Sequence, residues 1–185
     1  MKLRKPPHPE VFGTATYFYI QASHRQTAVQ TATAVIRETE KREHEALADD
    51  PDWQAFTSHM GAWVIESLLQ GVWMREYHEW EKATKAYFDG NQARNGSGKV
   101  DWKGKLPGIP GPSHVERVRA QLALFNASVP ADVVAAIDHT RERVNLAKHE
   151  ADHFIGEADY QALMQAVLAF WEPLTRQEEF TPPAR

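Results

Sequence analysis

The chain has 185 residues, a formal net charge of −4, and hydrophobic and charged fractions of 42% and 25%. These values resemble those of ordinary folded domains, so they exclude a fibrous or disordered chain and predict a single domain. The absence of cysteine excludes disulfides and cysteine nucleophiles. The mildly acidic charge excludes a protein that coats nucleic acid through bulk positive charge, although a local basic patch remains open. The N-terminus has no apolar stretch of the kind found in signal peptides, and no apolar run reaches the roughly 20 residues of a membrane span. We therefore expect a cytoplasmic protein that does not enter a membrane.

The first predicted element follows an N-terminal extension over residues 1–13. From Thr14 to Ala48 the chain contains no proline or glycine and is rich in alanine, which predicts a long helix. Aromatic and β-branched residues alternate between Thr14 and Ile20, so a short strand at the start remains an alternative.

A second helix should begin at Asp50-Pro51, because a capping carboxylate followed by proline is a strong helix-start signal. Its apolar residues recur every three or four positions from Met60 through Trp63, Val64 and Tyr77 to Phe88, which predicts a core-facing stripe. Glycines inside such a helix are costly relative to alanine, so Gly61 and Gly71 are expected at close helix crossings. Residues 90–112 are rich in glycine and proline and predict a long insertion.

Three further helices are predicted after the insertion. Ser113-His114-Val115-Glu116 has the spacing of a capping box, which predicts a helix to about Asn126. A fourth helix should open after Ser128-Val129-Pro130 and run to about His149, and a fifth should end before Pro173. The predicted fold is an all-α antiparallel bundle of about five helices over residues 14–176, followed by a tail over residues 177–185.

The stretch from Arg141 to Asp159 contains the candidate functional residues. His149-Glu150-Ala151-Asp152-His153 places two histidines four residues apart, as in zinc sites where the intervening glutamate acts as general base. A zinc-dependent hydrolase is therefore one alternative. Proteins built on this motif use a β-sheet to hold their substrate, however, and this chain offers no sheet.

A ferritin-like di-metal site is a second alternative, and it requires two Glu-x-x-His pairs on facing helices. Only Glu150 and His153 form such a pair. Five other glutamates of the long helices are expected on a solvated face, namely Glu40, Glu43, Glu76, Glu79 and Glu81.

A third interpretation treats Arg141, Asn145 and His149 as one helical stripe, because residues four apart share a face. Arginine can neutralise a phosphodiester, asparagine can position it, and histidine can transfer a proton to or from a ribose hydroxyl. Such a site needs no metal and no cofactor.

The segment Arg143-Val144-Asn145-Leu146-Ala147-Lys148-His149 resembles the signature of the HEPN superfamily (higher-eukaryote and prokaryote nucleotide-binding), in which an arginine precedes a histidine by four to six intervening residues. The resemblance extends from about Met60 to Trp171. It implies an antiparallel helical bundle that forms a homodimer and brings two such segments together in one cleft. Active members are metal-independent ribonucleases, often toxins or defence proteins, and others serve as binding modules.

The resemblance implies His149 as acid or base, with an arginine on the scissile phosphate. Arg143 has the spacing of the family, but five intervening residues place it about 240° around the helix from His149, whereas Arg141 lies on the same face as His149. Arg143 and His149 would therefore not converge within one straight helix, so either Arg141 supplies the charge or a second copy of the chain does. Helical geometry favours Arg141, whereas the family spacing favours Arg143. The predicted catalytic residues are Arg141, Arg143, Asn145 and His149, and the predicted partners are RNA and a second copy of the chain. A non-catalytic homodimer acting as an interaction module is the alternative.

Overall fold

The structure, a computed structural model, describes residues 14–95, 106, 108–125, 127–149 and 155–180. Within these residues the chain forms five α-helices and no strand, apart from one isolated bridge between Leu106 and Ile109. The predicted all-α bundle is confirmed. None of the described helices has a segment both long enough and apolar enough to cross a lipid bilayer.

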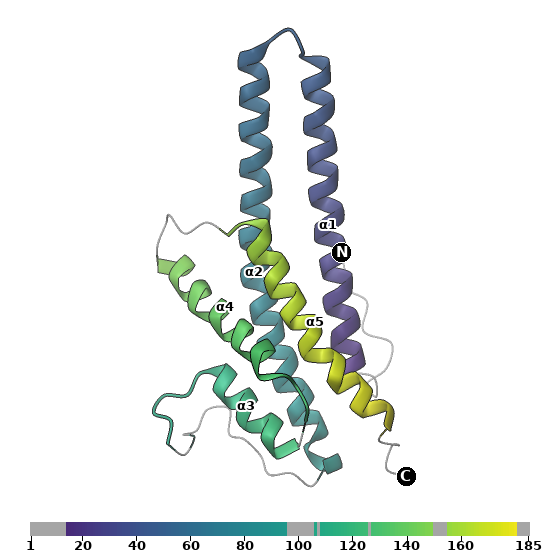
Figure 1. Ribbon diagram of the computed structural model, residues 1–185, viewed down its shortest axis with the longest axis vertical. Helices are drawn as coiled ribbons and strands as arrows, with labels where there is room; N and C mark the ends of the chain where they lie inside the picture. Colours follow the sequence, from purple (N-terminus) through teal and green to yellow (C-terminus); the bar gives the residue numbers. More distant parts are fainter. Residues whose placement is uncertain (1–13, 96–105, 107, 126, 150–154, 181–185) are drawn as a thin grey trace, which may run out of the picture.

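Two long antiparallel helices, α1 (Ala15–Ala46) and α2 (Pro51–Asn95), form a hairpin (Figure 1). At 1.5 Å per residue they extend about 48 and 68 Å. Thr14 caps α1 by accepting a hydrogen bond from the Tyr17 amide at 3.1 Å, so the alternative of an initial strand is wrong. The Asp50 carboxylate accepts from the Trp53 amide at 3.0 Å, which confirms the predicted start of α2.

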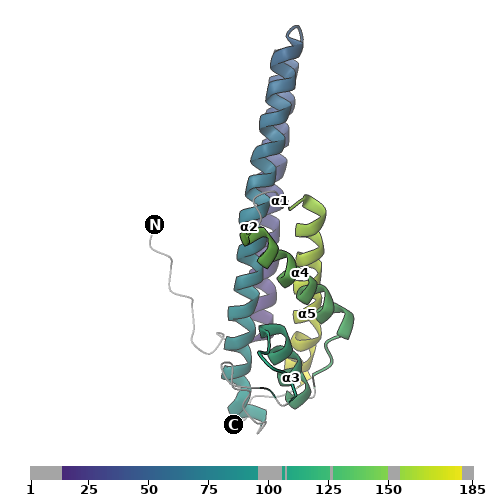
Figure 2. The same ribbon diagram turned by 90° about the vertical axis from the view of Figure 1, so that its left-hand side faces the viewer.

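Three shorter helices, α3 (His114–Phe125), α4 (Ala131–His149) and α5 (Glu157–Phe180), cover one face of the hairpin over its lower half. Figure 2 shows all three on the same side of α1 and α2, while the closed end of the hairpin extends beyond them. The α5 helix packs against α1, α2 and α4, and α2 contacts each of the other four helices.

The start of α3 follows the local sequence pattern, whereas the end of α5 does not. Ser113 and Glu116 form the predicted capping box, with bonds of 2.6 and 3.2 Å, and these bonds hold the pKa of Glu116 below its usual value. In contrast, α5 continues through Pro173 to Phe180 instead of ending before the proline. Its last turns carry Glu178, whose carboxylate accepts from the amide of Ala15 at 2.8 Å and so caps the start of α1.

The core lies where α5 crosses the hairpin, and large aromatic side chains dominate it. The largest fully buried aromatic residues are Trp73, Trp80, Phe88, Tyr160, Phe170 and Trp171. Several pack edge to face, for example Trp80 against Phe170 with ring centroids 5.3 Å apart. Such pairs add about 0.5–1.5 kcal/mol each beyond the burial of apolar area.

The core ends well below the closed end of the hairpin. No apolar side chain between Gln30 and Val64 is buried. The predicted core stripe of α2 is therefore wrong in its first part, because Met60, Trp63 and Val64 are 38, 56 and 38% exposed. Here the hairpin has only two helices, and no third element covers this side of α2 within the described residues.

The two glycines of α2 do not mark backbone crossings. Nothing lies within 4 Å of the position that a Cβ atom at Gly71 would occupy. At Gly61 the nearest atom is the carboxylate oxygen Oε2 of Glu40, 2.7 Å from that position, which belongs to a flexible side chain. The expectation of close helix crossings at these positions is wrong.

Candidate functional site

The predicted catalytic stripe lies in the second half of α4. The Nε of Arg141 donates to Asp138, one turn earlier, at 2.9 Å, and the Arg141 side chain is 31% exposed. Asn145 is exposed one turn later on the same face. His149 is the last residue of α4, and its side chain lies outside the described part of the structure.

Arg143 faces the protein interior and joins three helices. Its two terminal nitrogens donate to the carboxylate of Asp159 at the start of α5, one of them at 3.2 Å. Its guanidinium carbon lies 6.0 Å from the centre of the Trp73 ring on α2, within cation–π range. Residues two apart on a helix do not face each other, so Arg141 and Arg143 do not converge on one ligand within this chain.

The metal alternatives depend on residues outside the described part of the structure. Glu150, Asp152 and His153 all lie in the stretch 150–154, which is not described. Within the described ranges, no three histidine, aspartate or glutamate side chains come together in a way that could hold a metal ion.

An ion pair between α1 and α2 was missed by sequence reasoning. Glu76 is 1% exposed, and both of its oxygens accept from the Nε of Arg25, at 2.7 and 2.8 Å. Burial raises the pKa of Glu76, while the Arg25 charge and its hydrogen bond act in the opposite direction. The assignment of Glu76 to a solvated face is therefore wrong. A signal was present, because Glu76 lies three residues after Trp73 and four before Trp80, on the buried stripe of α2.

Several buried polar atoms of the core have no hydrogen-bond partner among the described residues. The hydroxyl of Tyr160 and the indole nitrogens Nε1 of Trp73 and Trp80 have no hydrogen bond to any described residue. Burial, and secondarily the charge of Glu76, raises the pKa of Tyr160, so this phenol stays neutral. Unsatisfied donors in a core are costly and often mark a place where a ligand or water completes the bonding.

A small groove opens beside the ion pair, between α1 and α2 with α5 as its floor. We call it the basal groove. It has a volume of about 260 Å³, and its walls include Phe18, Gln21, Arg25, Trp80, Ala83 and Trp171.

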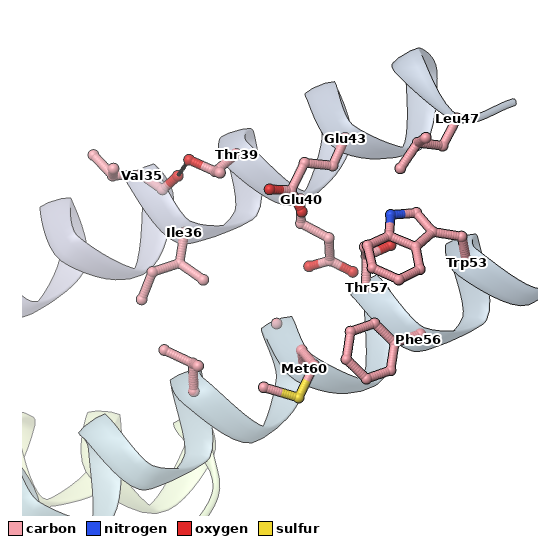
Figure 3. Close-up of a pocket in the computed structure, with 12 residues that line it drawn as sticks. Val35, Ile36, Thr39, Glu40, Glu43, Leu47, Trp53, Phe56, Thr57 and Met60 are labelled. Atoms are coloured by element: carbon pink, nitrogen blue, oxygen red, sulfur yellow. Dashed lines mark hydrogen bonds between the residues drawn. The ribbon is translucent and has the colours of Figure 1, made fainter.

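A larger groove of about 550 Å³ lies at the closed end of the hairpin, and we call it the tip groove. Its α1 side includes Val35, Ile36, Glu40, Glu43 and Leu47, and its α2 side includes Trp53, Phe56, Met60, Gly61 and Val64. Figure 3 shows Glu40 extending from α1 toward α2, with Trp53, Phe56 and Met60 opposite. The groove is thus apolar on most of its surface, with two carboxylates on its α1 side.

Comparison with protein-family models, with curated proteins and with solved structures finds no match for this chain.

Proposed function

We propose that this protein is a helical interaction module whose projecting hairpin binds a basic amphipathic helix of a partner protein in the tip groove. The observation that carries the proposal is the combination of exposed apolar side chains and two unpaired carboxylates on one side of the hairpin. Burial against a partner would stabilise the apolar face, and carboxylates enclosed in such an interface would need cations from that partner.

The exposed apolar area at the tip is of the size that protein interfaces use. Trp53 and Phe56, which line the tip groove, are 48 and 51% exposed. At about 150–250 Å² per aromatic side chain these two contribute about 200 Å², and Val35, Met60 and Val64 bring the total to about 400 Å². A standard interface buries about 800 Å² per partner, so the groove supplies about half of one side.

The shape of the surface favours a helix as the occupant. The groove residues Trp53, Phe56, Met60 and Val64 follow one another at steps of three, four and four residues, which places them on one face of α2. The groove runs along α1 from Val35 to Leu47, a length that about three helical turns of a partner would match. A third helix laid there would complete a three-helix bundle.

The charge of the tip selects a basic partner. Between Val35 and Val64 there are seven acidic and three basic residues, so this segment alone carries the formal net charge of −4 of the whole chain. The three basic residues are already paired: Arg37 with Glu157, Lys41 with Glu45 at 3.9 Å, and Arg42 with Glu38 at 3.1 Å.

The two groove carboxylates have no such compensation. Neither Glu40 nor Glu43 has a side-chain hydrogen bond or ion pair with any described residue. A second copy of the chain would bring the same two carboxylates against the same acidic surface, and like charges in an interface are unfavourable. The predicted homodimer stays a prediction, and the charge of the tip disfavours the tip as its interface.

The test uses the full chain and two model peptides of about 14 residues with leucine at helical spacing, one with lysine and one with glutamate at the polar positions. We expect the lysine peptide to bind saturably, as measured by tryptophan fluorescence and calorimetry. The double variant Glu40→Gln/Glu43→Gln should weaken binding at least about tenfold. The matched control Glu38→Gln/Glu45→Gln removes two carboxylates outside the groove and should change binding less than about twofold.

Equal binding of the glutamate peptide, or equal loss in both double variants, would overturn the proposal. Light scattering tests whether a second copy of the chain occupies the tip groove instead. A dimer that Phe56→Asp converts to monomer would show that a second copy fills the groove, and this result would also overturn the basic helix as its partner.

A metal-independent ribonuclease of the toxin or defence type, acting on RNA in the cytoplasm, is the second candidate. The observation that supports it is the position of Arg141 and Asn145, which lie on one accessible face of α4 and lead toward His149 at the helix end. Its test is loss of cleavage in His149→Ala, described below.

A further inference from the structure

We propose that the basal groove binds a small aromatic carboxylate, with its ring against Tyr17 and Phe18 and its carboxylate on Arg25. The groove lies at the base of the hairpin, away from the tip, and this proposal does not depend on the proposed function.

Arg25 is fixed in place yet has free donors. A guanidinium has five N–H groups, and Glu76 accepts only from the Nε. No hydrogen bond of its terminal nitrogens Nη1 and Nη2 is found among the residues described in the structure. Because the Glu76 side chain is 99% buried (1% exposed), the pair anchors Arg25 to the core while 30% of the Arg25 side chain remains exposed. The two terminal nitrogens can therefore form the paired hydrogen bonds that arginine makes with a carboxylate.

The other charges near the groove are balanced. Glu79 and Lys82 also line it, and they form an ion pair with each other at 3.0 Å. Gln21 offers an amide that can donate a further hydrogen bond. Arg25 is thus the group in this groove best placed to bind an anion.

The body of the ligand is defined by the aromatic walls. Tyr17 and Phe18 are half-buried and line the groove, and their rings meet edge to face with centroids 5.4 Å apart. Trp80 and Trp171 are each 1% exposed, so they back the groove without offering a ring face to a ligand. A flat ring would therefore rest against Tyr17 and Phe18.

The volume of the groove limits the ligand to one or two fused rings. At about 260 Å³ the groove is smaller than the roughly 300–1,000 Å³ of sites that bury drug-sized molecules. A nucleotide is therefore too large, and a simple aliphatic acid such as acetate would leave the aromatic walls uncovered.

The experiment compares 2-naphthoate with 2-naphthamide, which has the same ring but no charge. Titration of the full chain, followed by tryptophan fluorescence and calorimetry, should give saturable binding of naphthoate with a dissociation constant on the order of 0.1 mM. The amide should bind at least about tenfold more weakly, because it lacks the charge-assisted hydrogen bonds to Arg25.

Two variants locate the binding. Ala83→Leu fills the groove without changing its charges and should weaken naphthoate binding at least about tenfold. The matched control Ala162→Leu, at an exposed position of α5, should leave binding unchanged. Arg25→Gln/Glu76→Gln removes both charges of the ion pair together and should abolish the preference for acid over amide.

Three results would overturn the proposal: no saturation by naphthoate up to several times the expected dissociation constant, equal affinity for acid and amide, or equal affinity of Ala83→Leu and the unmodified protein. If Arg25→Gln/Glu76→Gln does not fold, the comparison of acid with amide and the Ala83→Leu variant decide the question alone.

Discussion

Replacing Arg25 with methionine should destabilise the protein more at about pH 8 than at about pH 5, because the change leaves the buried carboxylate of Glu76 without its cation. Removing one partner of a buried ion pair costs about 3–5 kcal/mol. Glu76 is 1% exposed but Arg25 is 30% exposed, so water can reach part of the site and the loss should be nearer 2–3 kcal/mol. This is a large fraction of the roughly 5–15 kcal/mol that stabilises a typical domain.

The pH dependence follows from the direction of the pKa shift. Burial raises the pKa of Glu76 above its usual value, so the folded protein holds this proton more tightly than the unfolded chain does. Protonation of Glu76 therefore stabilises the folded protein. This stabilisation is fully present below the unfolded pKa near 4.5 and is lost as the pH rises through the folded pKa. Arg25→Met removes the charge and the hydrogen bond of Arg25, the two largest of the three influences that lower the pKa of Glu76, and leaves the smaller influence of the Arg75 charge. The loss of stability therefore extends over a wider pH range.

Urea denaturation of the variant and the unmodified protein at both pH values measures the effect. His114 has a pKa lowered by burial and gives a slope of the opposite sign, but this slope is common to both proteins and cancels in their difference. Adding Glu76→Leu to Arg25→Met should restore most of the stability, since apolar side chains often replace a buried pair without loss. Equal destabilisation at both pH values, or no recovery in the double variant, would refute the reasoning.

Further predictions concern α2 and α4. Gly71→Ala should raise the free energy of unfolding by about 1 kcal/mol, because nothing surrounds the new methyl group; a fall in the urea midpoint would contradict this. Arg143→Met should lower stability by about 1 kcal/mol through loss of the partly exposed pair with Asp159, and Asp159→Asn should not add to that loss. If the protein cleaves RNA, His149→Ala should abolish cleavage, Arg141→Ala should reduce it more than Arg143→Ala, and the reaction should survive EDTA and leave a 2′,3′-cyclic phosphate. Cleavage that persists in His149→Ala would rule out this site.

Local signals in the sequence predict where the helices begin, because capping is a short-range interaction. Asp50 and the Ser113–Glu116 box start α2 and α3 as expected. The prediction that α5 ends before Pro173 is wrong, because a proline inside a helix costs only about 3 kcal/mol of stability and other contacts can outweigh this cost. The continuation lets Glu178 cap α1, a contact between residues 163 positions apart that no local pattern contains.

The period of apolar residues predicts which residues share a face but not what covers that face. Met60 and Tyr77 belong to the same predicted stripe of α2, yet Met60 is exposed and Tyr77 is buried. The difference arises because α4 and α5 reach only the lower half of the hairpin. The Arg25–Glu76 pair was missed for a similar reason, since its two members lie on different helices and only the assembled bundle brings them together.

The hairpin should tolerate shortening, and a shortened protein distinguishes binding at the tip groove from binding at the basal groove. Glu40 lies over Gly61, so residues of α1 and α2 whose numbers add to about 101 face each other. Deleting residues 37–43 together with residues 58–64 removes about two turns from each helix at matched height and nearly preserves the register of the rest.

Little stability should be lost, because no apolar side chain between Gln30 and Val64 is buried and the pair of Arg37 with Glu157 is exposed. We expect urea denaturation to show a change of at most about 1 kcal/mol. The shortened protein should still bind 2-naphthoate in the basal groove but lose the lysine peptide, because Glu40, Glu43 and half of the apolar wall are gone. Cooperative unfolding that disappears on deletion would show instead that the tip contributes to the fold, and the tip surface would then have a structural role.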